Sequence, residues 1–120
     1  MKTLEQWKAI TEYQGHAFTG KYEVSNWGNV RNRDTKAPLA FYSDNRGQGY
    51  LKCKIYDTEG IRVAIKVHRL VAHTFLDPAE PGKTEVNHKD GNPKNNSWTN
   101  LEWCSHIENI HHYVEGRKVV

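Results

Sequence analysis

The hydrophobic pattern changes period near residue 67, and this change constrains the fold more than any other feature of the sequence. Between Tyr50 and Val67, apolar and polar residues alternate on both sides of the turn-forming segment 57–60, as in a half-buried β-hairpin. The next residues take the spacing of one helix face: Val67, Leu70, Val71, Thr74 and Phe75. The sequence therefore predicts a hairpin that runs into a helix, with the apolar stripe of the helix packed on the apolar face of the hairpin. Segment 77–82, which contains Pro and Gly, should end the helix.

The polar side of the same hairpin is basic. The alternation puts four cations on one face: Lys52, Lys54, Arg62 and Lys66. Residues 21–69 hold ten Lys or Arg and five Asp or Glu, a net charge of +5, whereas the whole chain carries +3. A basic segment beside a slightly acidic remainder is typical of a surface that binds a polyanion, although charge alone fits solvated side chains nearly as well.

Length and composition exclude several classes of protein. A chain of 120 residues predicts one domain with a modest core. Four Trp, six Tyr and three Phe argue against disorder, and no apolar run is long enough to cross a membrane. The first residues lack the apolar stretch of a signal peptide, and the two cysteines, Cys53 and Cys104, are expected to be reduced. We therefore expect a cytoplasmic protein with no membrane partner.

The last third of the chain predicts a different unit, composed of two β-arms, a loop and a helix. Segment 85–93 contains a short strand that enters a loop rich in Asp, Gly, Asn and Pro, and residues 97–103 form a returning strand or extended arm. Ser105 and Glu108 have the spacing of a capping box, so a helix should begin at about His106. Its expected core face consists of Ile107, Ile110 and Val114, and its expected end is Gly116.

Polar residues suited to phosphodiester hydrolysis are spaced along this unit. Asn87 and His88 stand together, Asn100 follows His88 by 12 positions, and Asn109 follows it by 21. Hydrolysis of a phosphodiester needs an activated water, stabilisation of the phosphoryl charge and help for the leaving oxygen. A neutral imidazole can take the proton of the water, and a divalent ion can stabilise the charge. A hairpin followed by a helix would hold such groups rigidly from two directions.

This pattern resembles the HNH endonucleases, also called the His-Me finger or ββα-metal group, and is most similar to the branch found in phage and intron homing endonucleases. The similar strings are VHRLVAHTF (67–75), VNHKDGNPKNN (86–96), NLEWCSHIEN (100–109) and the following IHHY. The string YEVSNWGNVRN (22–32), preceded by Trp7 and Ile10, is similar to the small module ahead of the nuclease motif in many homing enzymes. The resemblance implies an α+β fold, in which a small antiparallel sheet module is followed by a helix and a ββα-metal nuclease motif.

The resemblance also implies a role for each polar residue of the motif. His88 would be the general base, Asn87 and Asn109 would bind one Mg²⁺ or Mn²⁺, and Asn100 would brace the loop and orient His88. We expect the imidazole and the two amide oxygens to converge on a single cation that holds a DNA phosphate. The implied activity is cleavage of double-stranded DNA by a monomer or a homodimer, as a nick or a double-strand break, in a bacterial or phage-infected cell.

The DNA-binding surface is expected mainly on a β-rich module of residues 1–66, with the nuclease motif at 67–120, two parts that could form one compact unit. A two-stranded ribbon fits the major groove, where lysine and arginine reach phosphates and guanine edges. The residues expected to contact DNA are Arg31, Arg33, Lys52, Lys54, Arg62, Lys66 and Arg69.

Three alternatives are compatible with the sequence. They arise because many relatives carry Asp or His at the position of Asn87. Two neutral amides as the metal ligands predict weak metal binding without DNA. Asp90 is an alternative ligand, although its Asp-Gly context favours a turn. The chain could instead be a DNA-binding protein of the same fold that has lost catalysis. A zinc site built from His106, His111 and His112 is a third interpretation, but no suitably spaced cysteine accompanies them.

Overall fold

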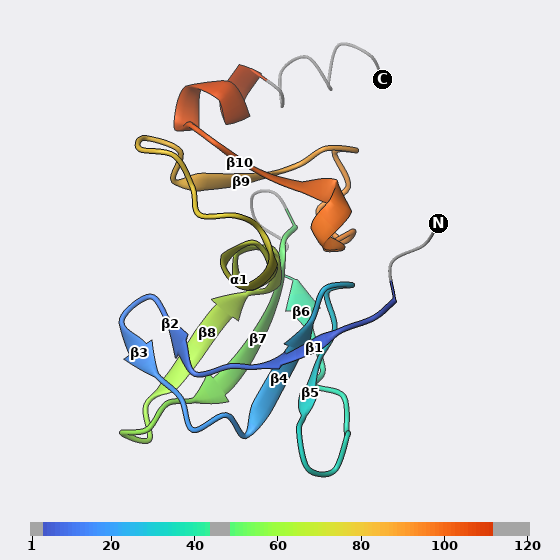
Figure 1. Cartoon of the computed structure of the whole chain (residues 1–120), viewed down its shortest axis with the longest axis vertical. Helices are drawn as coiled ribbons and strands as arrows, with labels where there is room; N and C mark the ends of the chain where they lie inside the picture. Colours follow the sequence, from blue (N-terminus) through green and yellow to red (C-terminus); the bar gives the residue numbers. More distant parts are fainter. Residues whose placement is uncertain (1–3, 44–48, 112–120) are drawn as a thin grey trace.

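The computed structural model describes residues 4–43 and 49–111 of the chain (Figure 1). The strands are β1 (Trp7–Ala9), β2 (Glu12–Tyr13), β3 (His16–Ala17), β4 (Tyr22–Ser25), β5 (Val30–Asn32), β6 (Tyr42–Ser43), β7 (Leu51–Tyr56), β8 (Arg62–Lys66), β9 (Glu85–His88) and β10 (Leu101–Cys104). The helical elements are α1 (Val67–Phe75), the 3-10 helix η1 (Trp98–Asn100) and a final helical segment at 106–111. The strands pair antiparallel as two three-stranded sheets, β1-β4-β5 and β6-β7-β8, and two ribbons, β2-β3 and β9-β10. Small antiparallel sheets with one main helix confirm the predicted α+β class.

The predicted hairpin is formed by β7 and β8. Lys52 lies opposite Lys66, and Tyr56 lies opposite Arg62, so the polar positions share one face of the hairpin. The alternate positions are buried and carry the apolar side chains, as the period of two predicts. The chain turns at residues 57–60 and continues from β8 directly into α1.

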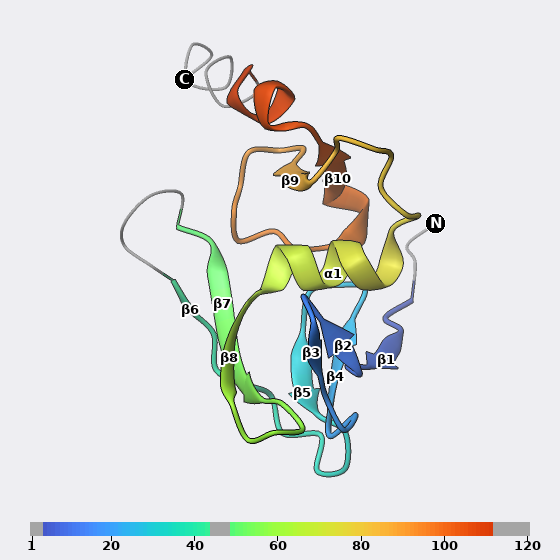
Figure 2. The same cartoon turned by 90° about the vertical axis from the view of Figure 1, so that its left-hand side faces the viewer.

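Helix α1 connects the N-terminal sheets to the last ribbon. Figures 1 and 2 show it between them, with β1 to β8 on one side and β9–β10 on the other. Its buried residues include Val67, Leu70 and Val71 of the predicted stripe. One hydrophobic cluster runs from the N-terminal sheets through α1 to Val86 of β9 and Leu101 of β10. The ribbon that carries the nuclease motif is therefore packed on the same core as the N-terminal strands.

The final helical segment begins at His106 as predicted, and its capping box is present. N of Ser105 donates to Oε1 of Glu108 at 3.0 Å, and N of Glu108 donates to Oγ of Ser105 at 3.1 Å. The predicted core face is wrong, because Ile107 is 66% and Ile110 46% exposed. Polar contacts with β9, described below, hold this segment to the ribbon instead of an apolar stripe. The residues expected to complete and end the helix, Val114 and Gly116, lie outside the described residues.

Two further expectations from the sequence concern the state of the cysteines and the absence of a membrane-spanning segment. Cys53 and Cys104 are buried free thiols. Burial raises the pKa of Cys53 to about 12 and that of Cys104 to about 11, so both thiols are protonated and poorly nucleophilic at neutral pH. Within residues 4–43 and 49–111, no helix has the length and apolar character needed to cross a bilayer.

Candidate active site

The two faces of the β9–β10 ribbon divide the polar residues of the predicted motif. Asn87 of β9 lies opposite Glu102 of β10. Because successive side chains of a strand point to opposite faces, Asn87 shares its face with Glu85, whereas His88 shares the other face with the core residue Val86. His88 is also the last residue of β9, where the loop of the motif begins.

Asn100 holds that loop in place. Its Nδ2 donates to Oδ1 of Asp90 and to O of Asn95, both at 2.9 Å, and its Oδ1 accepts from N of Asp90 at 3.1 Å. Its backbone O accepts from N of Lys89 at 2.8 Å. These contacts tie η1 to the loop at three residues, Lys89, Asp90 and Asn95.

Asp90 is engaged within the same loop. Its Oδ1 accepts from N of Asn92 at 2.8 Å as well as from Asn100, and its Oδ2 accepts from Nδ2 of Asn95 at 2.9 Å. The hydrogen bond from Asn95 is the main cause that lowers the pKa of Asp90, so this carboxylate is ionised at neutral pH. These bonds match the turn role predicted from Asp-Gly rather than a role as an alternative metal ligand.

His88 is buried at the end of β9, and Asn96 fixes its ring. Nε2 of His88 lies 2.7 Å from Oδ1 of Asn96, and the residue is 5% exposed. A carboxamide oxygen can only accept, so Nε2 carries the proton and Nδ1 of the neutral ring keeps its lone pair. Burial lowers the pKa of His88, and this effect outweighs the opposing hydrogen bond of Asn96 and charge of Asp90. The ring is therefore neutral at pH 7 and accepts a proton at Nδ1.

A stack of rings connects His88 to the basic hairpin. The ring centroid of His68 lies 4.4 Å from that of Tyr50 and 5.0 Å from that of His88. Nζ of Lys66 lies 5.8 Å from the centroid of Tyr50. Burial is the main cause that lowers the pKa of His68 to about 3, so at neutral pH this ring puts no charge beside His88. Lys66 of the hairpin and the ring of His88 are thus connected through the ring of Tyr50.

The opposite face of the ribbon carries two amides, each bonded to a carboxylate. Nδ2 of Asn87 donates to Oε1 of Glu102, and Nδ2 of Asn109 donates to Oε1 of Glu85, both at 2.9 Å. Nδ1 of His106 lies 2.6 Å from the second oxygen of Glu85. The hydrogen bond from Asn109 is the main cause that lowers the pKa of Glu85, which is therefore ionised at neutral pH. Each amide uses its nitrogen as the donor, and its carbonyl oxygen is the atom suited to bind a metal.

The donor set of this face fits a hard divalent cation. Mg²⁺ and Mn²⁺ prefer oxygen ligands, and the amide oxygens of Asn87 and Asn109 are accompanied here by the carboxylates of Glu102 and Glu85. The two carboxylates supply the negative charge that the amides lack. In the described ranges, no three His, Cys, Asp or Glu side chains gather as a metal site, so those residues give no support to a zinc centre. His112, the last residue of the zinc interpretation, lies outside those ranges.

The sequence predicts that the imidazole of His88 and the amide oxygens of Asn87 and Asn109 converge on one cation, but the ribbon places the imidazole and the amides on different faces. Asn87 and Asn109 bond to the carboxylates of one face, whereas the ring of His88 packs on the other side against His68. The physical reason is the period of two along β9, which turns consecutive side chains to opposite faces. The structure therefore pairs each amide with its own carboxylate, and separately pairs the imidazole with Asn96.

Four of the seven cations expected to contact DNA lie on the outer face of the β7–β8 hairpin: Lys52, Lys54, Arg62 and Lys66. Lys54 and Arg62 are exposed, and Nζ of Lys54 lies 5.1 Å from the ring centroid of Tyr42 on the neighbouring strand. Burial, with the nearby charges of Arg69 and Lys52, lowers the pKa of Lys66. The basic face predicted from the alternation is therefore present on the hairpin.

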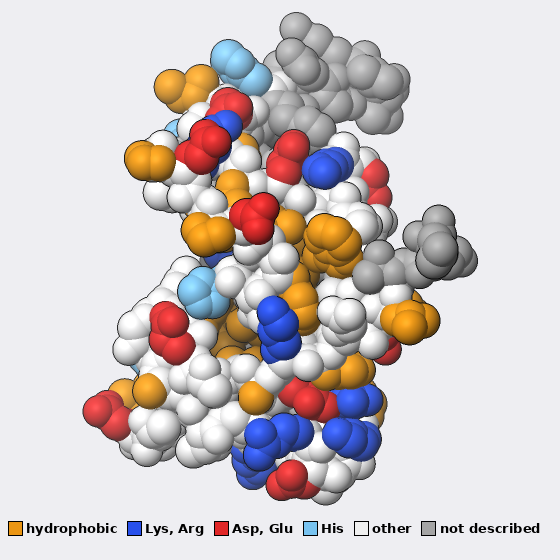
Figure 3. All heavy atoms as spheres, viewed as in Figure 1, with side chains coloured by type: hydrophobic (Ala, Val, Ile, Leu, Met, Phe, Trp, Pro, Cys, Tyr) orange, Lys and Arg blue, Asp and Glu red, His pale blue; other side chains and the backbone are white. Residues whose placement is uncertain are grey.

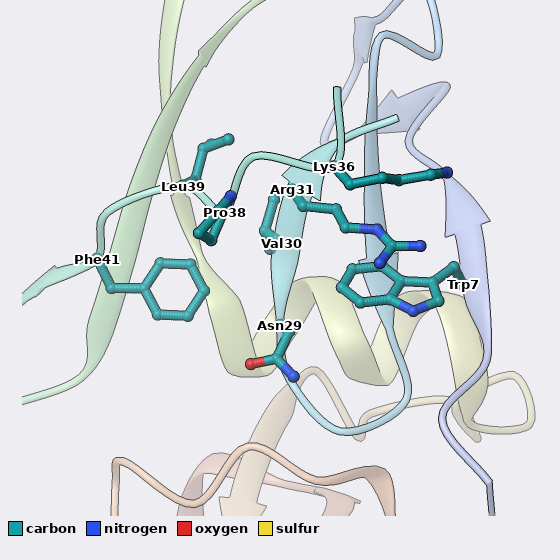
Figure 4. Close-up of a pocket in the computed structure, with 8 residues that line it drawn as sticks. All are labelled: Trp7, Asn29, Val30, Arg31, Lys36, Pro38, Leu39 and Phe41. Carbon is teal, nitrogen blue, oxygen red and sulfur yellow. The ribbon is translucent and has the colours of Figure 1, made fainter. Parts of the chain in front are cut away.

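Arg31 lies apart from the hairpin, in a pocket of about 420 Å³ lined by β1, β5 and the segment after β5 (Figure 4). Its Nε donates to Oε1 of Glu23 at 2.7 Å, and its guanidinium lies 3.6 Å from the ring centroid of Trp7. Nζ of Lys36 lies 3.4 Å from the same Glu23 oxygen. Burial would raise the pKa of Glu23, but the hydrogen bonds from Arg31 and Lys36 lower it. Arg31 therefore has a structural partner in this sheet.

The remaining two predicted DNA contacts also lie off the hairpin. Lys and Arg side chains gather over β5 and the segment after it on the face shown in Figure 3, and Arg33 is exposed in that region. Nη1 of Arg69 donates to O of Thr84 at 3.2 Å, which ties α1 to the loop before β9. The seven cations thus occupy more than one surface of the molecule.

The sequence-based interpretation missed four side chains of this site: Tyr50, Glu85, Asn96 and Glu102. Asn96 lies inside the string that carries the resemblance, but its pattern does not separate it from Asn95. Glu102 could have been found from the two β-arms, because an antiparallel register puts one residue directly opposite Asn87. Tyr50 had no signal in the sequence, because its contact with His68 depends on how the hairpin packs against α1.

Two family models match the chain. A model described as HNH endonuclease matches residues 66–111, and a model described as NUMOD4 motif matches residues 5–63. The resemblance to HNH endonucleases that carry a small N-terminal module is therefore confirmed.

Curated relatives and one solved structure extend the comparison. The chain is 39% identical to the uncharacterized HNH endonuclease L247 of Acanthamoeba polyphaga mimivirus, over 98% of this chain and 28% of that protein. It is 36% identical to the DNA endonuclease I-HmuI of Bacillus phage SP01, over 88% of this chain and 55% of that protein. A structure described as DNA binding and cleavage by the HNH homing endonuclease I-HmuI matches with a TM-score of 0.74 and 34% identity, over 96% of this chain and 60% of that one. The chain therefore spans only part of the length of each of these relatives.

Proposed function

Because the chain belongs to the HNH endonuclease family, we propose that it is a metal-dependent DNA endonuclease of the homing-enzyme type, which hydrolyses phosphodiester bonds in double-stranded DNA. The similarity to a phage DNA endonuclease supports DNA as the substrate and a bacterial or phage-infected cell as the setting. The proposed parts are His88 as general base, Asn96 and Asn100 as its supports, and Asn87 with Asn109 as metal ligands.

The orientation of His88 is the observation that carries this proposal. Its Nε2 is held by Oδ1 of Asn96 at 2.7 Å, which leaves Nδ1 as the atom that accepts the proton of the attacking water. Burial keeps the ring neutral, so no proton has to be removed before the reaction begins. Asn100 holds the loop between His88 and Asn96 in place, which limits the motion of these two side chains.

The division of the ribbon into two faces supports different roles for Asn87 and His88. An in-line displacement needs the proton acceptor on the attacking side of phosphorus and charge stabilisation on the leaving side. Consecutive residues of one strand point to opposite faces, which supports separate roles for His88, as the proton acceptor, and for Asn87, as a metal ligand. A bound Mg²⁺ or Mn²⁺ would stabilise negative charge on the phosphate and on the leaving oxygen. Asn87 and Asn109 would hold that ion, with Glu85 and Glu102 adding negative charge nearby.

Cleavage of a supercoiled plasmid tests this function directly. With Mg²⁺ or Mn²⁺ we expect relaxed or linear product. With EDTA we expect none, because the proposed cleavage needs the ion held by Asn87 and Asn109. The ratio of relaxed to linear product reports whether one strand or both are cut. A protein that binds the plasmid but cuts it with neither ion would be a DNA-binding protein of the same fold without catalysis. Cleavage that continues in EDTA would contradict the metal dependence.

The hairpin face is the proposed site of DNA contact, and its charge can be removed with little effect on folding. We expect Lys54→Ala and Arg62→Ala each to weaken DNA binding and to reduce the slope of log affinity against log salt by about one. Fluorescence anisotropy with a labelled duplex at several salt concentrations measures both quantities. Lys8→Ala is a matched control, because Nζ of Lys8 on β1 lies 3.5 Å from O of Thr74 and outside the hairpin face. Equal slopes for all variants would contradict this assignment.

A further inference from the structure

The turn between β4 and β5, residues 25–29, approaches the loop that holds Asn96 more closely than a side chain allows. Gly28 has φ of +92°, and a Cβ added there would lie 2.9 Å from both Cβ and O of Asn96. Such a short distance to backbone cannot be relieved by turning a side chain. Gly28 is therefore required both by its left-handed conformation and by the space that Asn96 occupies.

The turn itself is rigid. Oγ of Ser25 accepts from N of Trp27 at 3.2 Å and from N of Asn29 at 3.1 Å. N of Gly28 donates to O of Ser25 at 3.0 Å. Ser25 is fully buried, so its hydroxyl holds the turn from inside the molecule. Because these bonds hold the turn to Ser25 of β4, the position of β4 sets the position of Gly28.

A second contact joins the same turn to the nuclease loop. O of Asn26 accepts from N of Trp98 at 2.8 Å, which attaches the start of η1 two residues after Asn96. The side chain of Asn26 accepts from N of Gln6 at 2.8 Å and donates to O of Leu4 at 3.0 Å. The loop that carries Asn96 is thus fixed to the N-terminal part of the chain by one hydrogen bond and one steric contact.

We propose that the turn 25–29 of the N-terminal module is a positioning element for the general base, which acts through Asn96 on His88. This inference rests on the proposed nuclease function, and it deepens that function. Asn96 is 4% exposed and its Oδ1 accepts from Nε2 of His88, so a shift of its backbone moves the acceptor that selects the tautomer of the ring. The N-terminal module then has a part in catalysis as well as a surface for DNA.

The size of the displacement explains why it should affect the rate more than the fold. A Cβ at 2.9 Å from Asn96 comes to ordinary contact only at about 3.4 Å, so Asn96 has to move by about 0.5 Å, and the acceptor of the bond from Nε2 moves with it. Catalytic groups must stay within about 0.5 Å of their productive positions, so the chemical step is expected to slow strongly. DNA affinity depends on cations elsewhere and should change little. Such a split between rate and affinity distinguishes a positioning element from a contact with DNA.

Gly28→Ala is the direct test, and Gly15→Ala is its matched control. Gly15, in the β2–β3 turn, has φ of +82° with nothing within 4 Å of an added Cβ, so alanine there adds a similar backbone strain without a clash. We expect Gly28→Ala to lower the single-turnover cleavage rate at least about tenfold at unchanged DNA affinity, and Gly15→Ala to leave both unchanged. Equal rates for the two variants would overturn the proposal.

Nitrogen-15 NMR of the imidazoles gives a readout that does not depend on cleavage. In the parent protein His88 should show the tautomer protonated at Nε2, and Gly28→Ala should shift this tautomer toward a mixture, whereas Gly15→Ala should not. If Gly28→Ala fails to fold by circular dichroism, Ser25→Ala decides instead, because it removes the hydroxyl that closes the turn and leaves Asn96 its space. An unchanged His88 tautomer in the folded variant would overturn the inference.

The two proposals fail in different ways. A parent protein that cuts no DNA with Mg²⁺ or Mn²⁺ overturns the nuclease function, while a tautomer shift in Gly28→Ala would still show that the turn controls His88. A parent protein that cuts DNA, with Gly28→Ala equally active, leaves the nuclease function intact and overturns the positioning role.

Discussion

Replacing His88 with alanine is expected to lower the single-turnover rate of DNA cleavage by about a hundred- to ten-thousandfold, while DNA affinity changes little. In the proposed mechanism the imidazole accepts the proton of water, and the two described rings that stack near it, those of Tyr50 and His68, are poor proton acceptors at neutral pH. The neighbouring His68 has a pKa lowered to about 3 and lies stacked on Tyr50. Cleavage of a radiolabelled duplex, with affinity measured separately, gives both quantities.

Two controls make the result specific to His88. His73→Ala removes an exposed imidazole on α1 whose Nε2 lies 3.6 Å from Oε2 of Glu12. This variant should leave the cleavage rate unchanged. Thermal unfolding of His88→Ala must show a folded protein, because the ring is packed against His68. A folded His88→Ala variant that cuts DNA at the parent rate would contradict the role of general base.

The pH profile of the parent enzyme provides an independent check on the same group. The base is active when neutral, so cleavage falls as the pH drops through the pKa of His88. Because burial lowers this pKa, the rate should hold at pH values below about 6.5, where an ordinary histidine is already half protonated. A rate that declines from pH 7.5 downward would contradict the burial of a neutral ring.

Asn87→Asp is expected to raise the affinity for Mn²⁺ by at least about tenfold, which corresponds to about 1.4 kcal/mol. The substitution replaces a neutral ligand oxygen with a charged one, which a hard divalent ion prefers. Without metal the new carboxylate would face that of Glu102 instead of donating to it, so the variant should lose about 1–3 kcal/mol of stability. Titration of Mn²⁺ followed by electron paramagnetic resonance measures the affinity, and urea unfolding with and without Mn²⁺ measures the stability.

The double variant Asn87→Asp/Glu102→Gln separates the ligand role of position 87 from simple net charge. It keeps the total charge and restores a donor for the hydrogen bond across the ribbon. We expect its stability without metal to return toward that of the parent, while its Mn²⁺ affinity stays above the parent value. Parent-like Mn²⁺ affinity in both variants would show that position 87 does not bind the ion.

Several elements of the fold follow from the sequence because their causes are local. The alternation in β7 and β8 and the helical spacing of α1 report which side of each element is apolar, whatever it packs against. The capping box of Ser105 and Glu108 lies within one helical turn, so its two hydrogen bonds form where the spacing predicts. The core face predicted for the final helical segment is wrong because its cause is not local. Two isoleucines at helical spacing do not show whether an apolar partner lies beside them.

The sequence by itself determined the β7–β8 hairpin with its basic face, helix α1, the start of the final helical segment, and the residue types of the candidate site, including His88, Asn100 and the two asparagines proposed as metal ligands. Tertiary structure alone decided that His88 and Asn87 point to opposite faces of the ribbon and that Asn96 rather than Asn95 holds the imidazole. It also decided that Gly28 lies so close to Asn96 that no Cβ fits between them. Periodicity and capping act over a few residues and can be read along the chain. The contact between Gly28 and Asn96 spans 68 positions, and it exists only because both segments pack on one core around α1.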